Sequence, residues 1–515
     1  MAGSPSPVPS APQPPSPDPR ATTGRFSPWA GALLIIGVSA ALIQILTHAS
    51  VLVLQGLIAF GLLGYLVLEW PRLARGSRLF ALIIAAICAA MLLGPADEAA
   101  LGEAIRRTGF VAALFVCFGT LGMAASQSFL VRRFGLYMAT RGPGRRYLAL
   151  TGGGHLFALL LNFGMLPLLG AMATRGTAEA DSTDPTVPPE VRQRAALRRR
   201  RMALALHRTF CAVLTWSPMT VSTAVVLTAL GTVSWISVMP WLVLAGMVSL
   251  FIGWALDSLT QPKADPTAPA SEGSVEDPIG TARDALPLLA LLIAILLAAG
   301  AIATLTDTPL VVGAFVAAPL AAFVWCLIQP RFDHAQTATQ SALPYAVGLF
   351  RRHIATGVPN QRAEVVVVSG SSLVGTLIGQ SLSPDAITQA ATLVLGAQAG
   401  SELSAAWLLA VIPILTVILG QFGCNPLLSV SVLAAALPSP EALGVSPALW
   451  VLTLTGSWNL VAGSSPFTGA CLISARTAST SDAPHSARSF GLTLNGMHTL
   501  IQTLVLAGVL YALAS

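Results

Sequence analysis

Two stretches of the sequence place a proline beside small polar side chains inside otherwise apolar segments. Residues 422–429 read FGCNPLLS, and residues 464–468 read SSPFT. A proline removes a backbone donor and crowds the preceding turn, so an apolar helix breaks at such a point. A break at membrane depth frees backbone N–H and C=O groups and exposes helix-end dipoles, which can hold an ion or an anionic group. These stretches therefore indicate a binding site.

The same two patterns occur earlier in the chain and in the same order. FGMLPLLG at 163–170 matches FGCNPLLS with an offset of 259 residues, and WSPMT at 216–220 matches SSPFT with an offset of 248. Small polar residues in membrane helices also serve simply to let helices pack closely. The paired breaks predict two half-sites for a substrate or ion. Their candidate ligands are Asn162, Gly164, Ser217, Thr220, Gly423, Asn425, Ser429, Ser464, Ser465 and Thr468.

Few ionisable side chains lie within the apolar stretches, and each is a candidate for function: His155, His207, Arg208, Glu402 and His498. His155 follows TGGG in the first interrupted stretch, where an imidazole can relay a proton near neutral pH. Glycine-rich helix packing explains the TGGG run equally well. For Arg208 we expect the guanidinium to reach the cytoplasmic interface, as long cationic side chains near helix ends do.

Composition identifies the broad class. Of 515 residues, 54% are hydrophobic and only 10% are charged, and the mean hydropathy is +0.73. A soluble chain carries about a quarter charged residues, so this is an integral membrane protein. The net charge of +6 is almost all arginine and reports membrane orientation, not nucleic-acid binding. The six cysteines show no metal-site or disulfide spacing, and we expect no metal centre.

Apolar windows long enough to cross a bilayer predict an all-α polytopic fold with eleven membrane helices. Two further stretches, 147–172 and 386–437, are interrupted and are better explained as re-entrant or broken helices. The eleven predicted spans are 29–47, 49–70, 78–94, 109–131, 203–230, 233–256, 286–306, 309–328, 364–383, 446–475 and 490–513.

Arginine in short loops sets the orientation. Arginines follow the second and fourth predicted spans and also crowd residues 192–201, so these loops are predicted to be cytoplasmic. The chain must then return to the same side between 146 and 175, which a re-entrant hairpin allows and a single span does not. The span 364–383 consequently runs opposite to 109–131, and the two halves form an inverted repeat.

Together, these patterns divide the chain into six segments. A proline- and serine-rich tail covers residues 1–26, and we read no removable signal peptide in it. The remaining segments are a leading helix at 27–48, a first repeat at 49–256, a polar linker at 257–285, a second repeat at 286–515, and an interfacial arm at 329–363 within that repeat.

The arrangement resembles the ion transporter superfamily, which includes divalent anion:sodium symporters, arsenite pump subunits and citrate transporters. The resemblance implies one leading helix, two inverted repeats with a re-entrant hairpin and an unwound helix each, a homodimer, and residence in the cytoplasmic (inner) membrane. It also implies Na⁺ as a coupling ion, with no other cofactor. Divalent anion symporters carry a Ser-Asn-Thr motif, whereas this chain has Ser-Pro-x-Thr at 217–220 and 465–468.

We expect a secondary active transporter of a small, anionic solute, coupled to a proton or sodium gradient and working by alternating access. Its partners would be the lipid bilayer and the solute, with no nucleic acid. An ion channel or a membrane-embedded enzyme is the alternative. An enzyme would need a cluster of His and acidic residues, and no such cluster is evident; a channel would not need two inverted broken-helix units.

Overall fold

The computed structural model describes residues 24, 26–49, 51–92, 98–139, 143–230, 233–260, 281–331, 341–381 and 405–515. Within these ranges the chain is helical and has no strand. Most of the predicted tail, most of the predicted linker 257–285 and the first part of the interrupted stretch 386–437 lie outside the described residues.

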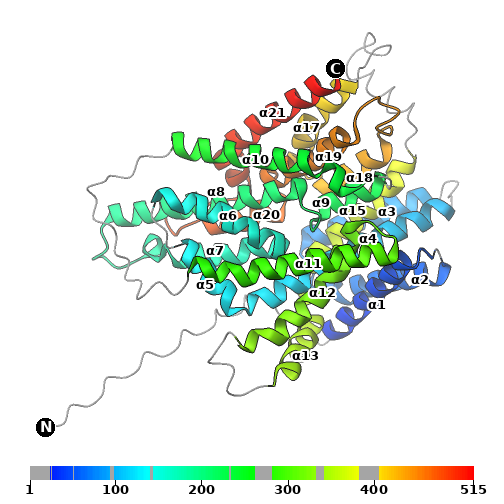
Figure 1. Ribbon diagram of the computed structural model, residues 1–515, viewed down its shortest axis with the longest axis horizontal. Helices are drawn as coiled ribbons and strands as arrows, with labels where there is room; N and C mark the ends of the chain where they lie inside the picture. Colours follow the sequence, from blue (N-terminus) through cyan, green and yellow to red (C-terminus); the bar gives the residue numbers. More distant parts are fainter. Residues whose placement is uncertain are drawn as a thin grey trace.

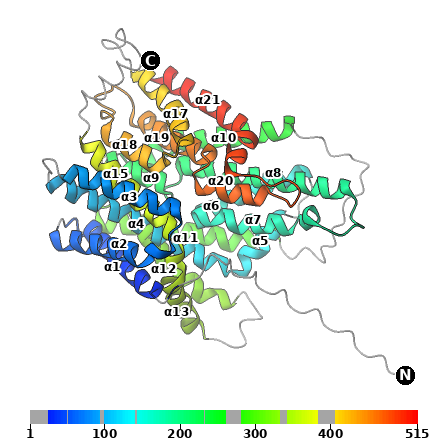
Figure 2. The same cartoon turned by 180° about the vertical axis from the view of Figure 1, so that it is seen from behind.

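The helices pack side by side into one elongated assembly (Figures 1 and 2). In chain order they are α1 (Ser27–Leu46), α2 (Leu52–Glu69), α3 (Arg75–Leu92), α4 (Glu98–Ser126), α5 (Phe129–Ala139), α6 (Pro143–Leu161), α7 (Met165–Arg175), α8 (Pro189–Trp216), α9 (Val221–Leu230), α10 (Trp235–Thr260), α11 (Ala285–Thr306), α12 (Leu310–Ile328), α13 (Ala342–Arg352), α14 (Val358–Asn360), α15 (Arg362–Ser381), α17 (Ala405–Gln421), α18 (Pro426–Ala436), α19 (Pro447–Ser464), α20 (Gly469–Ala478) and α21 (Gly496–Ala514).

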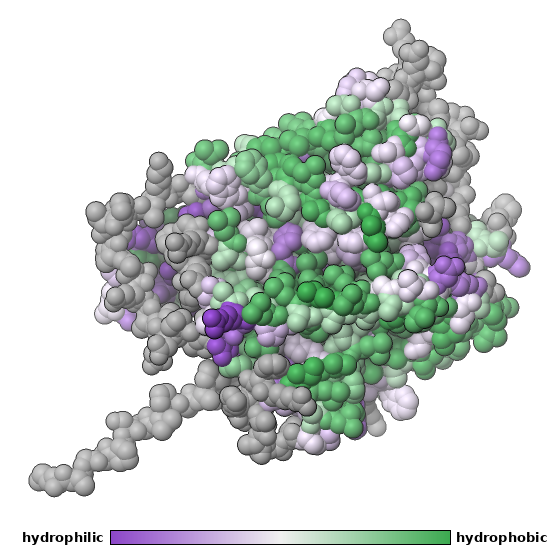
Figure 3. Space-filling view, in the orientation of Figure 1, coloured by the Kyte–Doolittle hydropathy of each residue, from purple (hydrophilic) through white to green (hydrophobic). Residues whose placement is uncertain are grey.

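In the part of the chain that the structure describes, ten helical segments are long and apolar enough to cross a membrane. Large apolar side chains such as Leu52, Leu259 and Leu305 are more than four-fifths exposed, and apolar surface runs along the sides of the molecule in Figure 3. Water would make such a surface costly, whereas lipid matches it. The ten helices indicate a multi-pass membrane protein, as the composition predicts.

The expected count of eleven spans differs from the ten found. The predicted spans 78–94 and 446–475 are not among the ten, whereas a segment inside the interrupted stretch, Tyr147–Arg175, is long enough to be counted. The first difference arises because the part of α3 whose side chains are described, residues 75–91, is shorter than any of the ten counted segments. The second arises because α19, although 18 residues long, carries polar residues along its length, among them Thr453, Thr455, Ser457 and Asn459.

Packing divides the helices into two bundles. Helices α1–α4 and α11–α15 form the α4–α15 bundle, named for its two central helices, and α6–α10 with α17–α21 form the α8–α19 bundle. Both views place α1, α2 and α12 away from α17, α19 and α21 (Figures 1 and 2). Within the α4–α15 bundle, buried Glu69 pairs with Arg72 and Arg362 and accepts a hydrogen bond from Ser27. This cluster ties α1 and α2 to the start of α15.

The expectation that Arg208 reaches the interface is wrong. Its side chain is buried inside the α8–α19 bundle, where Nε donates to Asn495 Oδ1 at 2.9 Å and Nη1 donates to the Gly253 carbonyl at 3.0 Å. The Asn495 amide in turn donates to the carbonyl of Gly463. Hydrogen bonds to the charged group offset its burial, and they tie α8 to α10, α19 and the start of α21.

A second buried arginine joins loops from the two halves of the sequence. Arg199 of α8 donates to Asp181 Oδ2 at 2.6 Å, to the Thr177 carbonyl at 2.7 Å and to the Ser479 carbonyl at 3.0 Å. The other oxygen of Asp181 accepts the backbone N–H of Ser481 at 2.9 Å. Partial burial raises the pKa of Asp181, but the bonds from Ser481 and Arg199 outweigh it, so this pKa lies below its ordinary value.

Stability should therefore depend on pH through Asp181. Its folded pKa lies below that of the unfolded chain, so the ionised carboxylate stabilises the fold above about pH 4 and loses this effect as pH falls through the folded pKa. We expect Asp181→Asn to lower the thermal unfolding midpoint at neutral pH, and the gap to wild type to close in acid. The exposed Asp482→Asn serves as the control. A gap that persists unchanged in strong acid would contradict the ion-pair explanation.

Candidate functional site

The first helix break lies between α8 and α9. Pro218 has no N–H to continue the helix, and the hydroxyls beside it pair with the backbone at the break: Ser217 Oγ accepts the Met219 N–H, and Thr220 Oγ1 donates to the Ser217 carbonyl. Both residues are almost completely buried. Their side chains hold the break in shape, because unpaired backbone groups at membrane depth are costly.

The second break, between α19 and α20, follows the same local chemistry. Ser465 Oγ accepts the Phe467 N–H and donates to the Gly420 carbonyl of α17 at 2.7 Å. Thr468 Oγ1 donates to the carbonyls of Ala462 and Ser465 and accepts the Cys471 N–H, which caps α20. The Ser-Pro-x-Thr pattern therefore has a structural role in both halves.

The turn between α6 and α7 is a short 3-10 segment, Asn162–Gly164. Asn162 has a φ of +50°, a left-handed conformation that asparagine tolerates better than most residues. Its side-chain amide donates to the Met219 carbonyl at 2.9 Å, so this turn is fixed to the first break. A Cβ atom built at Gly164 would lie 3.6 Å from Gly122 of α4, which brings the turn beside that helix.

The turn between α17 and α18 explains the FGCNPLLS stretch. Gly423 has a φ of +98°, which side-chain-bearing residues rarely adopt. Asn425 caps α18 by accepting the Leu427 N–H at 2.8 Å, and Pro426 occupies the first helical position, where no N–H is needed. Ser429 Oγ donates back to the Asn425 carbonyl. Glycine, asparagine and proline thus start a new half-helix.

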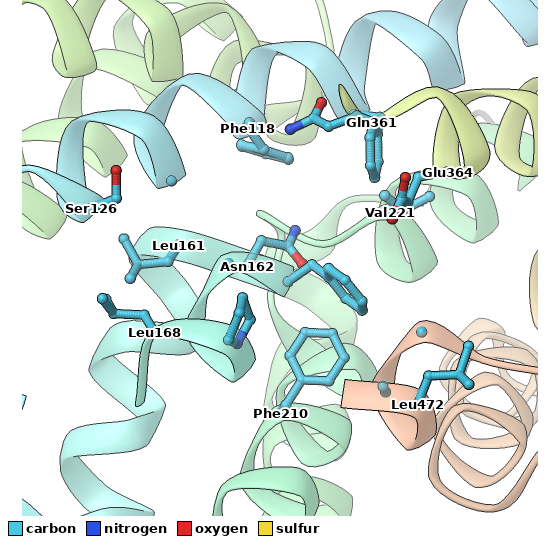
Figure 4. Close-up of a pocket in the computed structure, with 18 of the residues that line it drawn as sticks. Phe118, Ser126, Leu161, Asn162, Leu168, Phe210, Val221, Gln361, Glu364 and Leu472 are labelled. Carbon is cyan, nitrogen blue, oxygen red and sulfur yellow. The ribbon is translucent and has the colours of Figure 1, made fainter. Parts of the chain in front are cut away.

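A cavity of about 1680 Å³ lies between the two bundles. It is lined by the turn between α6 and α7, by the start of α18 and by the break between α19 and α20. Four predicted site residues, Asn162, Gly164, Asn425 and Thr468, belong to its lining (Figure 4 labels Asn162). The other predicted ligands lie outside that lining: Ser217, Thr220, Gly423, Ser429, Ser464 and Ser465.

His155 also lies outside the cavity lining. Its ring stacks on Trp216 at the end of α8, with ring centroids 5.9 Å apart, and Trp216 Nε1 donates to His155 Nε2 at 3.4 Å. The imidazole therefore packs against the residue that precedes the first break. Its proposed role as a proton relay would have to act through that break.

Sequence reasoning missed the wall of the cavity formed by the α4–α15 bundle. His353, Gln361 and Glu364 line it, and so do Arg132 and Arg175. Glu364 is the one carboxylate in the described lining. Its position at the very start of a predicted apolar span was the available signal, but span counting treats such a residue as a boundary. Aromatic residues complete the lining: Phe115, Phe118, Phe163, Phe210, Trp458 and Phe467.

The electrostatics of the cavity follow from the half-helices that begin at its edge. The first residues of α7, α9, α18 and α20 border or belong to its lining. The first N–H groups of a helix have no partner within the helix, and its N-terminus carries a partial positive charge. Capping by Asn425 and Thr468 satisfies one N–H each. At the start of α7 the Met165 N–H already donates to the carbonyls of Asn162 and Phe163, so the N–H groups that favour an anionic group in the cavity are mainly those of α9, α18 and α20.

Substitution of Asn162 should separate backbone strain from its hydrogen bond. Asn162→Gly loses the bond to Met219 but keeps the left-handed conformation, whereas Asn162→Ala loses the bond and adds about 1 kcal/mol of strain. We expect the glycine variant to unfold at the higher temperature. This order is opposite to that in an ordinary helix, where alanine is the more stabilising residue. Equal or reversed midpoints would contradict the strained turn.

The chain matches no protein-family model, and no curated protein matches it. An assignment of function therefore depends on the cavity, the broken helices that border it and the charges they present.

Proposed function

We propose that the protein is a secondary active transporter that moves a small solute with an anionic group across the cytoplasmic membrane by alternating access, coupled to a proton or sodium gradient. The observation that carries this proposal is the meeting of four half-helix N-termini at one cavity between two bundles. A channel would need a continuous path. An enzyme would use the ionisable side chains of the lining, whereas the half-helix N-termini meet at the part of the cavity that presents Asn162, Asn425 and backbone N–H groups.

An inverted repeat is supported by reciprocal packing. In the α8–α19 bundle, α7 packs against α20 and α18 packs against α9, so each half-hairpin contacts the broken helix of the other half. In the α4–α15 bundle the two central helices pack together, α12 covers α4, and α3 covers α15. These pairings fit the repeats 49–256 and 286–515, with α1 as the leading helix.

A re-entrant form of α6 and α7 is supported by their contacts with α5. A side chain at Gly153 of α6 would meet Met138, and one at Gly135 would meet Met172 of α7. Met138 and Gly135 are one turn apart on α5, whereas Gly153 and Met172 would be about 28 Å apart in a continuous helix. The chain can satisfy both contacts if it folds back at Asn162, as the arginine distribution also requires.

The two bundles meet differently on the two sides of the site. Helix α18 packs closely on α15: a Cβ at Gly375 would lie 2.7 Å from the Ser431 Cβ. The equivalent pair, α4 and α7, is separated by the cavity, which both helices line. Gly-Thr-Leu at 119–121 matches Gly-Thr-Leu at 375–377, so α4 carries the surface that α15 uses. Alternating access would close α7 onto α4 and release α18 from α15.

If α7 replaces α18 as the half-helix in contact with the α4–α15 bundle, one residue pair should come together in the second state of the transporter. By the sequence matches, Gly119 corresponds to Gly375 and Met172 to Ser431. At present Gly164, just before α7, lies beside Gly122 of α4. To bring Met172 beside Gly119, α7 must shift along α4 by about eleven residues, which is about 16 Å at 1.5 Å per residue. The α8–α19 bundle would slide by that distance along the α4–α15 bundle, whose outer faces are proposed to pair in a homodimer.

Cysteine cross-linking should detect that contact. In a variant without native cysteines, Gly119→Cys with Met172→Cys should form a disulfide when the protein visits the opposite state, because the two Cα atoms would come within about 7 Å. The Gly375→Cys and Ser431→Cys pair should cross-link in the present state and serves as the matched control. Reduction should restore the transport that either disulfide blocks. Cross-linking of the control pair alone would rule out the proposed exchange.

Transport in liposomes tests the function itself. Purified protein should accumulate radiolabelled solute from a panel of sulfate, citrate, succinate and amino acids when a proton or sodium gradient is imposed. Asn425→Ala and Thr468→Val should weaken uptake. Because both side chains cap a helix, each variant should also lose about 1 kcal/mol of stability, so uptake is compared per folded protein. Pro466→Ala should weaken uptake further, because a restored helix withdraws the freed backbone groups. Pro426→Ala should have a smaller effect, because Pro426 occupies the first position of α18 and the turn at Gly423 remains.

The exposed loop variant Glu441→Gln is the control for reconstitution. Uptake that survives all four substitutions would remove the site assignment. Current that exceeds carrier turnover, with no dependence on an imposed gradient, would favour the channel alternative.

A further inference from the structure

The cavity wall opposite the half-helix N-termini is made by three polar side chains from a short stretch of the chain. His353 belongs to a π-helical turn, His353–Gly357, Gln361 follows α14, and Glu364 lies in the first turn of α15. All three line the cavity. Figure 4 shows Gln361 and Glu364 on the same side of the cavity, with Asn162 facing them from the turn between α6 and α7.

Two side-chain atoms of this wall are buried without a hydrogen-bond partner, and its carboxylate forms no ion pair with the described residues. No arginine, lysine or histidine nitrogen of the described residues lies within 4.0 Å of the Glu364 carboxylate. This carboxylate accepts its own backbone N–H, and Arg362, which pairs with Glu69, attracts it from a longer distance. Gln361 Oε1 and His353 Nε2 are both buried without a hydrogen-bond partner. Burial lowers the pKa of His353 to about 4, so its ring is neutral near pH 7. None of the three side chains therefore carries a positive charge near pH 7.

The wall formed by His353, Gln361 and Glu364 and the turn between α6 and α7 both contact α4. Gly164 of the turn lies beside Gly122, and the Gln361 amide nitrogen would be 3.3 Å from a Cβ at Gly119. Gly119 and Gly122 are one turn apart on α4. A Cβ at Gly469, the first residue of α20, would lie 2.5 Å from the Phe163 ring, so the same turn also borders the N-terminus of α20. The wall and that N-terminus are therefore both neighbours of the turn between α6 and α7. Arg132 and Arg175, the other charged residues of the lining, come from α5 and from the far end of α7.

We propose that the solute is a small zwitterion whose ammonium group binds Glu364 and Gln361 Oε1 while its carboxylate lies at the N-termini of α18 and α20. The inference rests on the proposed function and names the substrate class of the same cavity. The ammonium supplies the donors that this wall lacks, and charge-assisted hydrogen bonds to a carboxylate are strong. The carboxylate of the solute accepts hydrogen bonds from the backbone N–H groups that remain unpaired at the N-termini of these half-helices. A dicarboxylate would place a second negative charge against Glu364.

Matched ligand pairs test this proposal without any need for transport. Each pair differs by one ammonium group: phenylalanine and hydrocinnamate, leucine and isocaproate, glutamate and glutarate. Binding to the full-length protein in detergent is measured from tryptophan fluorescence, since Trp458 lines the cavity. We expect the ammonium-bearing member of at least one pair to bind about tenfold tighter or more.

Glu364→Gln should reduce that ratio to near one while leaving the affinity for the deaminated ligand unchanged. Gln361→Met should reduce the ratio in part, and Glu441→Gln should not change it. Because Glu364 also lies at a helix N-terminus, its substitution can lower stability, but a purely structural role would change both members of a pair equally.

Equal affinities within every pair, no binding by any ammonium-bearing ligand, or discrimination that survives Glu364→Gln would each overturn the proposal. A ligand that binds with the expected discrimination but is not accumulated in liposomes would leave this inference standing and contradict the transport function.

Discussion

The structure depends on one constraint: backbone polar groups at membrane depth must find partners, because lipid offers none. The broken helices meet this constraint with their own hydroxyls. Ser217 and Thr220 bond the backbone of the first break, and Ser465 and Thr468 do so at the second. Each break is therefore a stable element and not a local defect. The N–H groups left over after this pairing are the ones available to a ligand.

The same constraint explains what the sequence could predict. Prolines and glycines in apolar stretches have few physical explanations, so the breaks, the turn at Gly423 and the cap at Asn425 were accessible from sequence. The role of each hydroxyl was not, because a serine that binds a ligand and one that holds a turn look alike in a sequence. Four of the ten predicted ligands line the cavity, and the others include the hydroxyls that hold the breaks.

Long-range burial was the other limit. Arg208 lies in an apolar stretch near a basic run, which is typical of an interfacial side chain. Its hydrogen-bond partner Asn495 is 287 residues away, and no pattern in the sequence around Arg208 indicates that contact. Glu364 was missed for the opposite reason: its neighbours in sequence place it at a helix end, and only the packing of α15 beside α4 turns that end toward a cavity. Patterns identify elements well, but contacts between distant elements require the fold.

The two buried arginines also bear on how the protein is made. Arg199 and Arg208 are synthesised with the first half of the chain, while Ser479 and Asn495, which accept their hydrogen bonds, follow 280 and 287 residues later. At 5–20 residues per second this interval is on the order of 15 to 60 s. For that time two guanidinium groups lack part of their final coordination, and the nascent first half must keep them near water or near an insertion factor. The carboxy-terminal helices thus supply hydrogen-bond acceptors to the amino-terminal half of the protein. A chain that ended before Ser479 would leave both guanidinium groups without these acceptors.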